Sequence, residues 1–166
     1  MATANRISLE EYLHTTYEPD CDYVDGVLED RNVGKRRHSR TQMRLIQTLS
    51  PIAASFGLEP LPEQRLQVSP TKVRIPDVCL VPKSDDSEVP RDPPVLCIEV
   101  LSSDDRPIRL ARLIADYLAF GVPLIWIIDP YNHEAFVVTQ ENRAPEQVDE
   151  LRWRDVSISL TEILSD

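Results

Sequence analysis

Residues 74–81 read RIPDVCLV and residues 95–103 read VLCIEVLSS, and these two stretches decide the fold. Both are rich in β-branched and other apolar residues, which is typical of buried strands. Each stretch nevertheless contains one acid, Asp77 in the first and Glu99 in the second. Burying a carboxylate costs several kcal/mol unless it is paired or bound to a cation. We therefore expect a partner or a function for both acids.

An antiparallel pairing of the two stretches would bring the acids side by side. Asp77 lies near the start of its strand, and Glu99 lies near the end of the next. The same register would set Cys79 opposite Cys97 on the face of the acids, because alternate residues of a strand share a face. We expect the two cysteines to be small buried hydrophobic residues rather than thiolate ligands, since they do not form a CxxC motif.

Two interpretations of the acids are open. For either acid alone, an arginine partner such as Arg74 or Arg109 is the simpler one. Together, two carboxylates with a backbone carbonyl and waters suit Mg²⁺ or Mn²⁺, which prefer hard oxygen ligands in octahedral geometry. Such an ion can stabilise a phosphodiester transition state and activate a water for attack on phosphorus.

The periodicity of the rest of the chain predicts alternating helices and strands. Helices are expected over residues 8–13, 36–56 and 105–120, a hairpin over residues 22–29, and strands over residues 65–69, 73–81, 95–101, 124–128 and 134–139. The second helix has an apolar stripe of Met43, Ile46, Leu49, Ala53 and Phe56, and Pro51 should kink or split it. This order implies an α/β fold class, an α+β mixed sheet with helices packed on it.

The composition favours one domain over residues 1–166, long enough to bury one core. No apolar run is long enough to cross a membrane and the first residues lack a signal-peptide pattern, so we expect a cytoplasmic protein with reduced cysteines. With four glycines there is no glycine-rich phosphate loop, and no Ser-His-Asp arrangement is recognisable.

The net charge of -10 argues against an indiscriminate nucleic-acid binder, because affinity for a phosphate backbone comes mainly from Lys and Arg. Any DNA-binding face must be local. The densest candidate is the basic segment from Asn32 to Arg44, NVGKRRHSRTQMR. A solvated helix start explains this segment equally well.

Several short motifs occur in a fixed order along the chain. They are Asp22-Tyr-Val-Asp-Gly26, Pro76-Asp77, Glu99-Val-Leu-Ser102, Tyr117, Gly121-Val-Pro123 and Trp126-Ile-Ile-Asp129-Pro130. This set resembles the Uma-type family of putative restriction endonucleases in the PD-(D/E)xK nuclease superfamily, over about Ser8 to Asp129. The resemblance implies a restriction-endonuclease-like core, a central mixed β-sheet flanked by helices. It also implies Asp77 and Glu99 as metal ligands, with Asp22, where the family usually has Glu, as a further carboxylate.

The sequence departs from the family pattern at the lysine. The superfamily motif would place it at Leu101, and the Uma-type family commonly places it at Leu113. Leu113 lies within the apolar stripe of its helix, whereas Arg109 lies at the flank and Arg112 on nearly the opposite side. Arg109 is therefore the better substitute cation, although arginine steadies charge and cannot accept a proton.

Two functions follow from the sequence. The first is a Mg²⁺- or Mn²⁺-dependent DNA endonuclease in which Asp77 and Glu99 bind the ion and Arg109 or Arg112 stabilises charge. The second is a catalytically degenerate relative that keeps the fold as a binding or dimerisation module. A homodimer is expected by analogy, because nucleases of this fold often need two sites for two strands. The isolated His38 and His133 are interpreted as surface or capping residues, with a slightly better case for His38 because of its basic surroundings.

Overall fold

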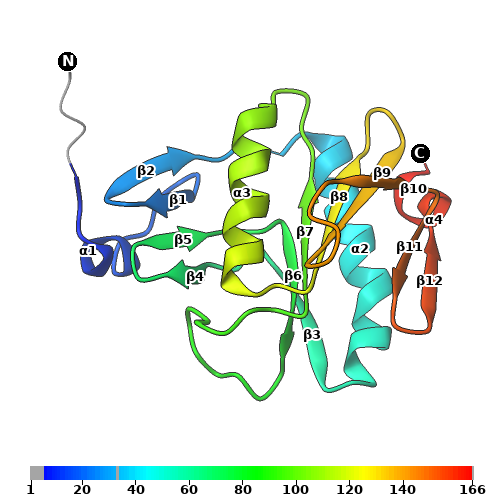
Figure 1. The fold of residues 1–166 in the computed structure, drawn as a ribbon, viewed down its shortest axis with the longest axis horizontal. Helices are drawn as coiled ribbons and strands as arrows, with labels where there is room; N and C mark the ends of the chain where they lie inside the picture. The colour runs from blue at the N-terminus through cyan, green and yellow to red at the C-terminus, as the bar shows by residue number, and fades with distance from the viewer. Residues whose placement is uncertain (1–5, 33, 166) are drawn as a thin grey trace.

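The computed structural model describes residues 6–32 and 34–165, and its strands fall into three sheets (Figure 1). Across the six-stranded sheet the order is β10 (Glu146–Val148), β9 (Glu134–Thr139), β8 (Leu124–Asp129), β7 (Leu96–Val100), β6 (Val78–Pro82) and β3 (Leu58–Pro62). The four-stranded sheet runs β2 (Val27–Asp30), β1 (Cys21–Val24), β5 (Lys72–Arg74) and β4 (Leu66–Ser69), and β11 (Glu150–Trp153) pairs with β12 (Val156–Ser159). The helices are α1 (Leu9–Leu13), α2 (Arg36–Ala54), α3 (Pro107–Phe120) and α4 (Leu160–Leu164).

Strands β6 and β7 pair in the predicted register. They are antiparallel, with Val78 opposite Ile98 and Cys79 opposite Cys97. Continued by one residue, this register sets Asp77 opposite Glu99. Strand β7 is parallel to β8, so the large sheet is mixed, and the predicted fold class is confirmed.

The two long helices cover opposite faces of this sheet (Figure 1). On the α2 face, Leu45 and Leu49 pack in a cluster with Leu80, Ile98 and Trp126. On the α3 face, a second cluster joins the buried side of the helix to alternate residues of the strands: Leu113, Ile114, Tyr117, Cys79, Cys97 and Ile125. Because alternate residues share a face, the acids lie on the α3 side together with the two cysteines.

The predicted single strand over residues 73–81 is wrong. The chain leaves the small sheet after Arg74 and enters the large sheet at Val78. Pro76 lies in the break and has no N–H to donate to a ladder, so it cannot continue a central strand. Asp77 therefore stands at the corner where the chain passes from one sheet to the other.

Helix α2 differs from its prediction in two ways. It is one continuous helix over Arg36–Ala54, with Pro51 in its last turn. Its buried face is His38, Thr41, Leu45, Leu49 and Ala53, at helical spacing, while Met43 and Phe56 are exposed. The predicted stripe used apolar residues alone, so it did not include the polar His38 and Thr41 at the start of the buried face.

Other local predictions hold. Ser8 caps α1 by accepting a hydrogen bond from the Glu11 N–H, and Asp25 and Gly26 have the positive φ angles that the β1–β2 hairpin turn requires. Strand β3 was missed because its sequence, LEPLP, contains two prolines. It lies at the edge of the large sheet, where proline is tolerated.

The three cysteines are buried and free, as expected. In the described ranges, no helix combines the length and the apolar character needed to cross a membrane.

Truncation of Leu49 tests the packing of α2 on the sheet. Leu49 is 0% exposed, so Leu49→Ala should lower the free energy of unfolding by about 2–5 kcal/mol, measured by urea denaturation. The control is Met43→Ala on the same helix, which should change it by less than about 0.5 kcal/mol. Equal losses in the two variants would contradict the described orientation of α2.

Candidate active site

Asp77 and Glu99 lie on the wall of a small polar cavity at the end of β7. Both are buried, with exposures of 6% and 7%. The cavity, here called the acid cavity, has a volume of about 20 Å³, and its other lining residues are Arg31, Asn32, His38, Val100, Ser102, Asp105 and Arg109. This volume is enough for about one water-sized species. The strand register thus brings the two acids side by side, as expected.

The Asp77 carboxylate is held by groups from strand β7, from helix α2 and from the end of the β1–β2 hairpin. Its Oδ2 accepts a hydrogen bond from the Val100 N–H at 2.7 Å, and its Oδ1 lies 3.2 Å from His38 Nε2 and 3.4 Å from Arg31 Nη2. Gln42 donates to the backbone carbonyl of Asp77 at 2.7 Å. These contacts fix both the position and the orientation of this carboxylate.

Glu99 has a different environment. Its Oε1 accepts a hydrogen bond from the Tyr117 hydroxyl at 2.6 Å. Within residues 6–32 and 34–165 it forms no ion pair, and Oε2 has no hydrogen-bond partner. Burial raises the pKa of Glu99 well above its usual range, and the charge of Asp77 raises it further. Glu99 is therefore a buried acid without an ion-pair partner among the described residues, and the charge of Arg31 lowers its pKa only in part.

Asp22, the third predicted metal ligand, is not part of the acid cavity. It is 0% exposed, and its Oδ2 accepts hydrogen bonds from Arg74 and Arg109, each at 3.1 Å. Its Oδ1 accepts from the Ile75 N–H at 3.1 Å. In the part of the chain that the structure describes, no group of three or more His, Cys, Asp or Glu side chains is arranged to hold a metal ion. The expected cluster of three carboxylates is not assembled, because two arginines and a backbone amide already engage Asp22.

The arginine partners also differ from the prediction. Neither Arg74 nor Arg109 pairs with Asp77 or Glu99. Both bind Asp22, and Arg74 additionally binds Glu29 at 2.7 Å and Asp116 at 2.8 Å.

The cation beside Asp77 is Arg31, which the sequence did not single out. Burial lowers its pKa, but the charges of Asp77 and Glu99 outweigh burial, so the pKa is raised. Arg31 immediately follows β2 in the chain. Only the placement of the small sheet against the large one brings it to the acids.

The substitutes proposed for the missing lysine lie in different places. Arg109 lines the acid cavity, whereas Arg112 is exposed and lines the adjoining groove instead. Leu113 is 2% exposed within the apolar cluster under α3, and Leu101 packs against the same cluster. Neither lysine position carries a charge.

His38 is closer to the chemistry than its sequence context suggested. Burial lowers its pKa, but the hydrogen bond and the charge of Asp77 outweigh burial, and the net shift is upward. Its Nδ1 is buried without a hydrogen-bond partner among the described residues. In the sequence, its position in the first turn of α2, on the same helix face as Thr41, Leu45 and Leu49, was the available signal. His133, by contrast, is exposed in the turn before β9, as expected.

A family model described as Uma2, putative restriction endonuclease, matches residues 9–165. The chain belongs to the Uma2 family. Among solved structures, it is similar to the crystal structure of a putative nuclease belonging to DUF820 from Anabaena variabilis, with a TM-score of 0.84 and 20% sequence identity. The match covers 96% of this chain and 98% of that chain, and at this identity it establishes the shared fold.

A second solved structure, a cryo-EM complex of DrdV with DNA, has a TM-score of 0.43 and 20% identity over 78% of this chain and 11% of that chain. That similarity is too low to support an argument. A comparison with curated proteins gave no match. Family membership thus confirms the resemblance seen in the sequence, and the roles of individual residues in this Uma2 protein rest on its own geometry.

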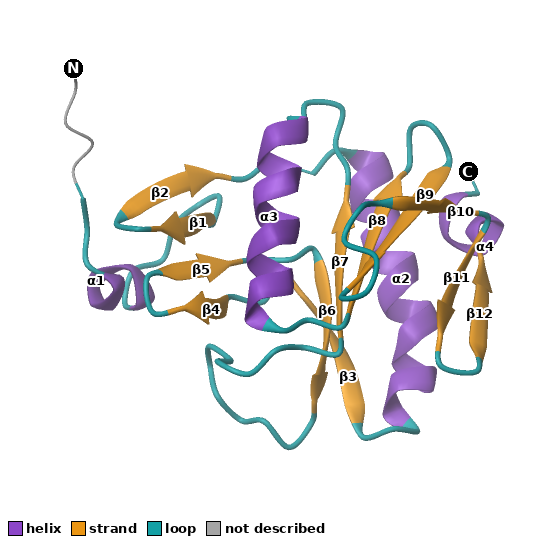
Figure 2. Cartoon of the chain, viewed as in Figure 1, coloured by secondary structure: helices purple, strands orange, loops and turns teal. Residues whose placement is uncertain are grey.

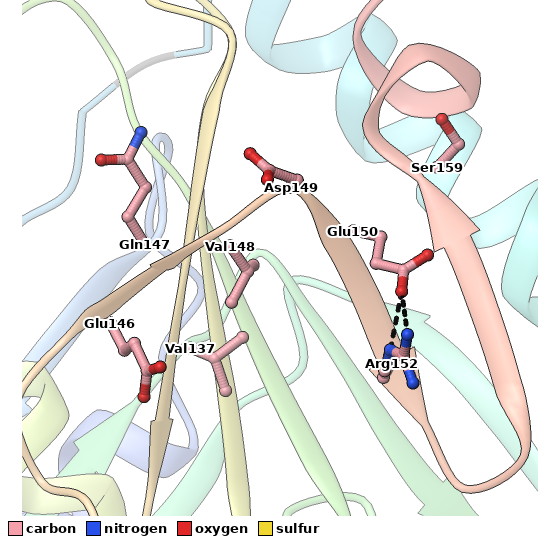
Figure 3. Close-up of a pocket in the computed structure, with 8 residues that line it drawn as sticks. All are labelled: Val137, Glu146, Gln147, Val148, Asp149, Glu150, Arg152 and Ser159. Carbon is pink, nitrogen blue, oxygen red and sulfur yellow. Dashed lines mark hydrogen bonds and ion pairs between the residues drawn. The ribbon is translucent and has the colours of Figure 1, made fainter.

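A larger cavity of about 590 Å³ lies between β10 and the β11–β12 hairpin (Figure 3). Figure 3 shows Val137 and Val148 near its centre, with polar and charged side chains around them. Glu150 is paired with Arg152 and accepts a hydrogen bond from Ser157. This cavity shares no residue with the acid cavity of the Uma2 chain.

Stability as a function of pH tests the environment of Glu99. Its raised pKa in the folded state means that the group stabilises the fold most below its unfolded pKa of about 4.3, and that this contribution is lost as the pH rises. Glu99→Gln removes the ionisable group. In EDTA, the variant should therefore gain stability over the native protein above about pH 4, by at most about 1.4 kcal/mol per pH unit.

The measurement is urea unfolding of both proteins across this pH range. Glu141→Gln, at an exposed position, is the matched control and should track the native protein. An advantage of Glu99→Gln that is flat or shrinks with rising pH would refute the described environment.

Proposed function

We propose that this Uma2 protein is a metal-dependent endonuclease that hydrolyses phosphodiester bonds of DNA, with Asp77 and Glu99 as the ligands of Mg²⁺ or Mn²⁺. The observation that carries the proposal is the buried acid pair in which Glu99 has no ion-pair partner among the described residues. A buried carboxyl of this kind is costly to ionise, and a cation beside it removes that cost.

The donor set fits such an ion. Asp77 and Glu99 would supply carboxylate oxygens, the ligands that Mg²⁺ and Mn²⁺ prefer, and the cavity has room for about one small species. When bound, the ion would stabilise negative charge on a phosphodiester and lower the pKa of water.

The protein's own residues would orient and balance this centre. His38 and the Val100 N–H hold the Asp77 carboxylate, and Tyr117 holds that of Glu99. Arg31 and Arg109 place two guanidinium groups on the cavity wall, where they would face a phosphate. Arg31 would thereby share with Arg109 the charge-stabilising role that the sequence offered to Arg109 or Arg112.

The basic start of α2 would contact the DNA backbone. Arg36 and Arg37 are exposed and Arg40 is half-buried, and none forms an ion pair with a described carboxylate. The same helix reaches the acid cavity through His38, so its basic first turns begin beside the centre. Val33, within the basic segment, lies outside the described residues. A homodimer would supply two acid cavities, one for each strand of a duplex.

A second candidate function is a binding or dimerisation module without catalysis. It is favoured by Leu113, which is packed in the core where the family commonly has its lysine. Such a module would keep the fold and the DNA-binding face. The two candidates differ in hydrolysis alone.

Plasmid nicking and metal titration test the proposed function together. The purified protein should nick supercoiled DNA with Mg²⁺ or Mn²⁺, and Asp77→Asn and Glu99→Gln should each lower the rate by more than about 100-fold, since each removes a charged metal ligand. Calorimetric titration with Mn²⁺ should give a saturable heat in the native protein that Glu99→Gln loses. Asp149→Asn, an isosteric change in the larger cavity, should leave both results unchanged.

The outcomes separate the candidates. Mn²⁺ binding without nicking would support the module, and Leu113→Lys would then show whether the missing cation alone prevents hydrolysis. Absence of Mn²⁺ binding would overturn the metal site.

A further inference from the structure

A second groove opens beside the acid cavity, along the first turns of α3. It has a volume of about 380 Å³ and is here called the α3 groove. Its α3 wall includes Arg106, Ile108, Arg109 and Arg112, and its other wall is the end of β2, at Glu29 and Asp30. Arg109 lines both the groove and the acid cavity, so the two adjoin.

Two arginines of the groove have no carboxylate partner among the described residues. Neither Arg106 nor Arg112 forms an ion pair with a described residue. Of the acids opposite, Glu29 is engaged by Arg74 at 2.7 Å, and Asp30 is exposed without an ion pair to a described residue, so the three arginines of the groove outnumber its one unpaired acid. In a chain of net charge -10, carboxylates are abundant, so two unpaired guanidinium groups beside a buried acid pair mark a surface suited to an anion.

The groove also presents an exposed hydrophobic side chain. Ile108 is 69% exposed, more than any other large hydrophobic residue in residues 6–32 and 34–165, where the next is Met43 at 50%. It stands between Arg106 and Arg112 in the sequence. Arginines with an apolar residue among them match a nucleic-acid strand, whose phosphates alternate with sugars and bases that offer apolar contacts.

The two basic helix starts lie at the same end of the molecule (Figures 1 and 2). The acid cavity joins them, because its wall includes His38 of α2 and Arg109 of α3. A polyanion that reaches the acids would therefore meet unpaired arginines on both helices. A small anion would span only one of these surfaces.

We propose that the α3 groove binds a DNA strand beside the acid pair, with Arg106 and Arg112 contacting phosphates and Ile108 packing against sugars or bases. The inference rests on the proposed function, since it assigns a second binding surface to the same substrate. The start of α2 holds the DNA on the other side of the acid cavity, and the two surfaces together set the strand across Asp77 and Glu99.

The salt dependence of binding tests the groove. A short fluorescein-labelled DNA duplex is titrated with the protein in EDTA, so that binding is measured without cleavage, by fluorescence anisotropy at several salt concentrations. The double variant Arg106→Gln/Arg112→Gln should bind more weakly and lose about 2 from the slope of log K against log salt, because each phosphate contact contributes about 0.9. Arg91→Gln/Arg143→Gln makes the same charge change at two exposed loop arginines and should leave the slope unchanged.

Ile108→Ala provides a second measurement. It should weaken binding without changing the slope, because an apolar contact releases no counterions. A native slope in Arg106→Gln/Arg112→Gln, an equal loss in the Arg91/Arg143 control, or no binding of the duplex by the native protein would each overturn the groove.

The nicking assay separates this result from the proposed function. Nicking with an unaltered salt slope in Arg106→Gln/Arg112→Gln would refute the groove and keep the endonuclease. A lost slope without any nicking by the native protein would keep the groove as a DNA-binding surface and refute the endonuclease.

Discussion

The pairing of β6 with β7 is the interaction on which the rest of the structure depends. Its register sets Cys79 opposite Cys97 and thereby carries Asp77 and Glu99 to adjacent places at one end of the sheet. That end is enclosed by α3 and by the start of α2, so both carboxylates are taken from water. The free energy of two neighbouring buried charges then governs which side chains can surround them.

The protein solves the burial of each acid differently. Asp22 pairs with Arg74 and Arg109, in a network that continues to Glu29 and Asp116, although burial outweighs these arginines and raises its pKa. Asp77 has a backbone amide, His38 and Arg31. Glu99 has a single neutral donor, the Tyr117 hydroxyl. Of these three acids, Glu99 is the one without an ion-pair partner among the described residues, so in the proposed endonuclease an external cation would stabilise it most.

The sequence predicted the centre of the fold better than its surroundings. Strand pairing obeys a period of two and an integer register, so once Asp77 was set opposite Glu99, position sums placed Cys79 opposite Cys97, as the structure has them. The break between β5 and β6 could not be predicted from the sequence. Residues 73–81 have the composition of one continuous strand, although the chain changes sheets at Pro76. Arg31 and the engagement of Asp22 were equally invisible, since both depend on how the small sheet docks against the large one. Local periodicity carries no information about that docking.

The two expected lysine positions show that a sequence motif and the electrostatics of a site can diverge. A lysine motif specifies where in the chain a cation should stand, whereas the buried acids require only that positive charge be near. Leu113 lies with Tyr117 in the apolar cluster under α3, where it adds packing instead of charge. Arg31, from the end of the β1–β2 hairpin, lies 3.4 Å from Asp77 and supplies that charge from a different sheet. A guanidinium group meets the electrostatic need of the site but accepts no proton, so any proton acceptor must come from elsewhere in the acid cavity. In the proposed endonuclease, charge stabilisation and proton transfer, which one lysine can combine, would therefore fall to different groups.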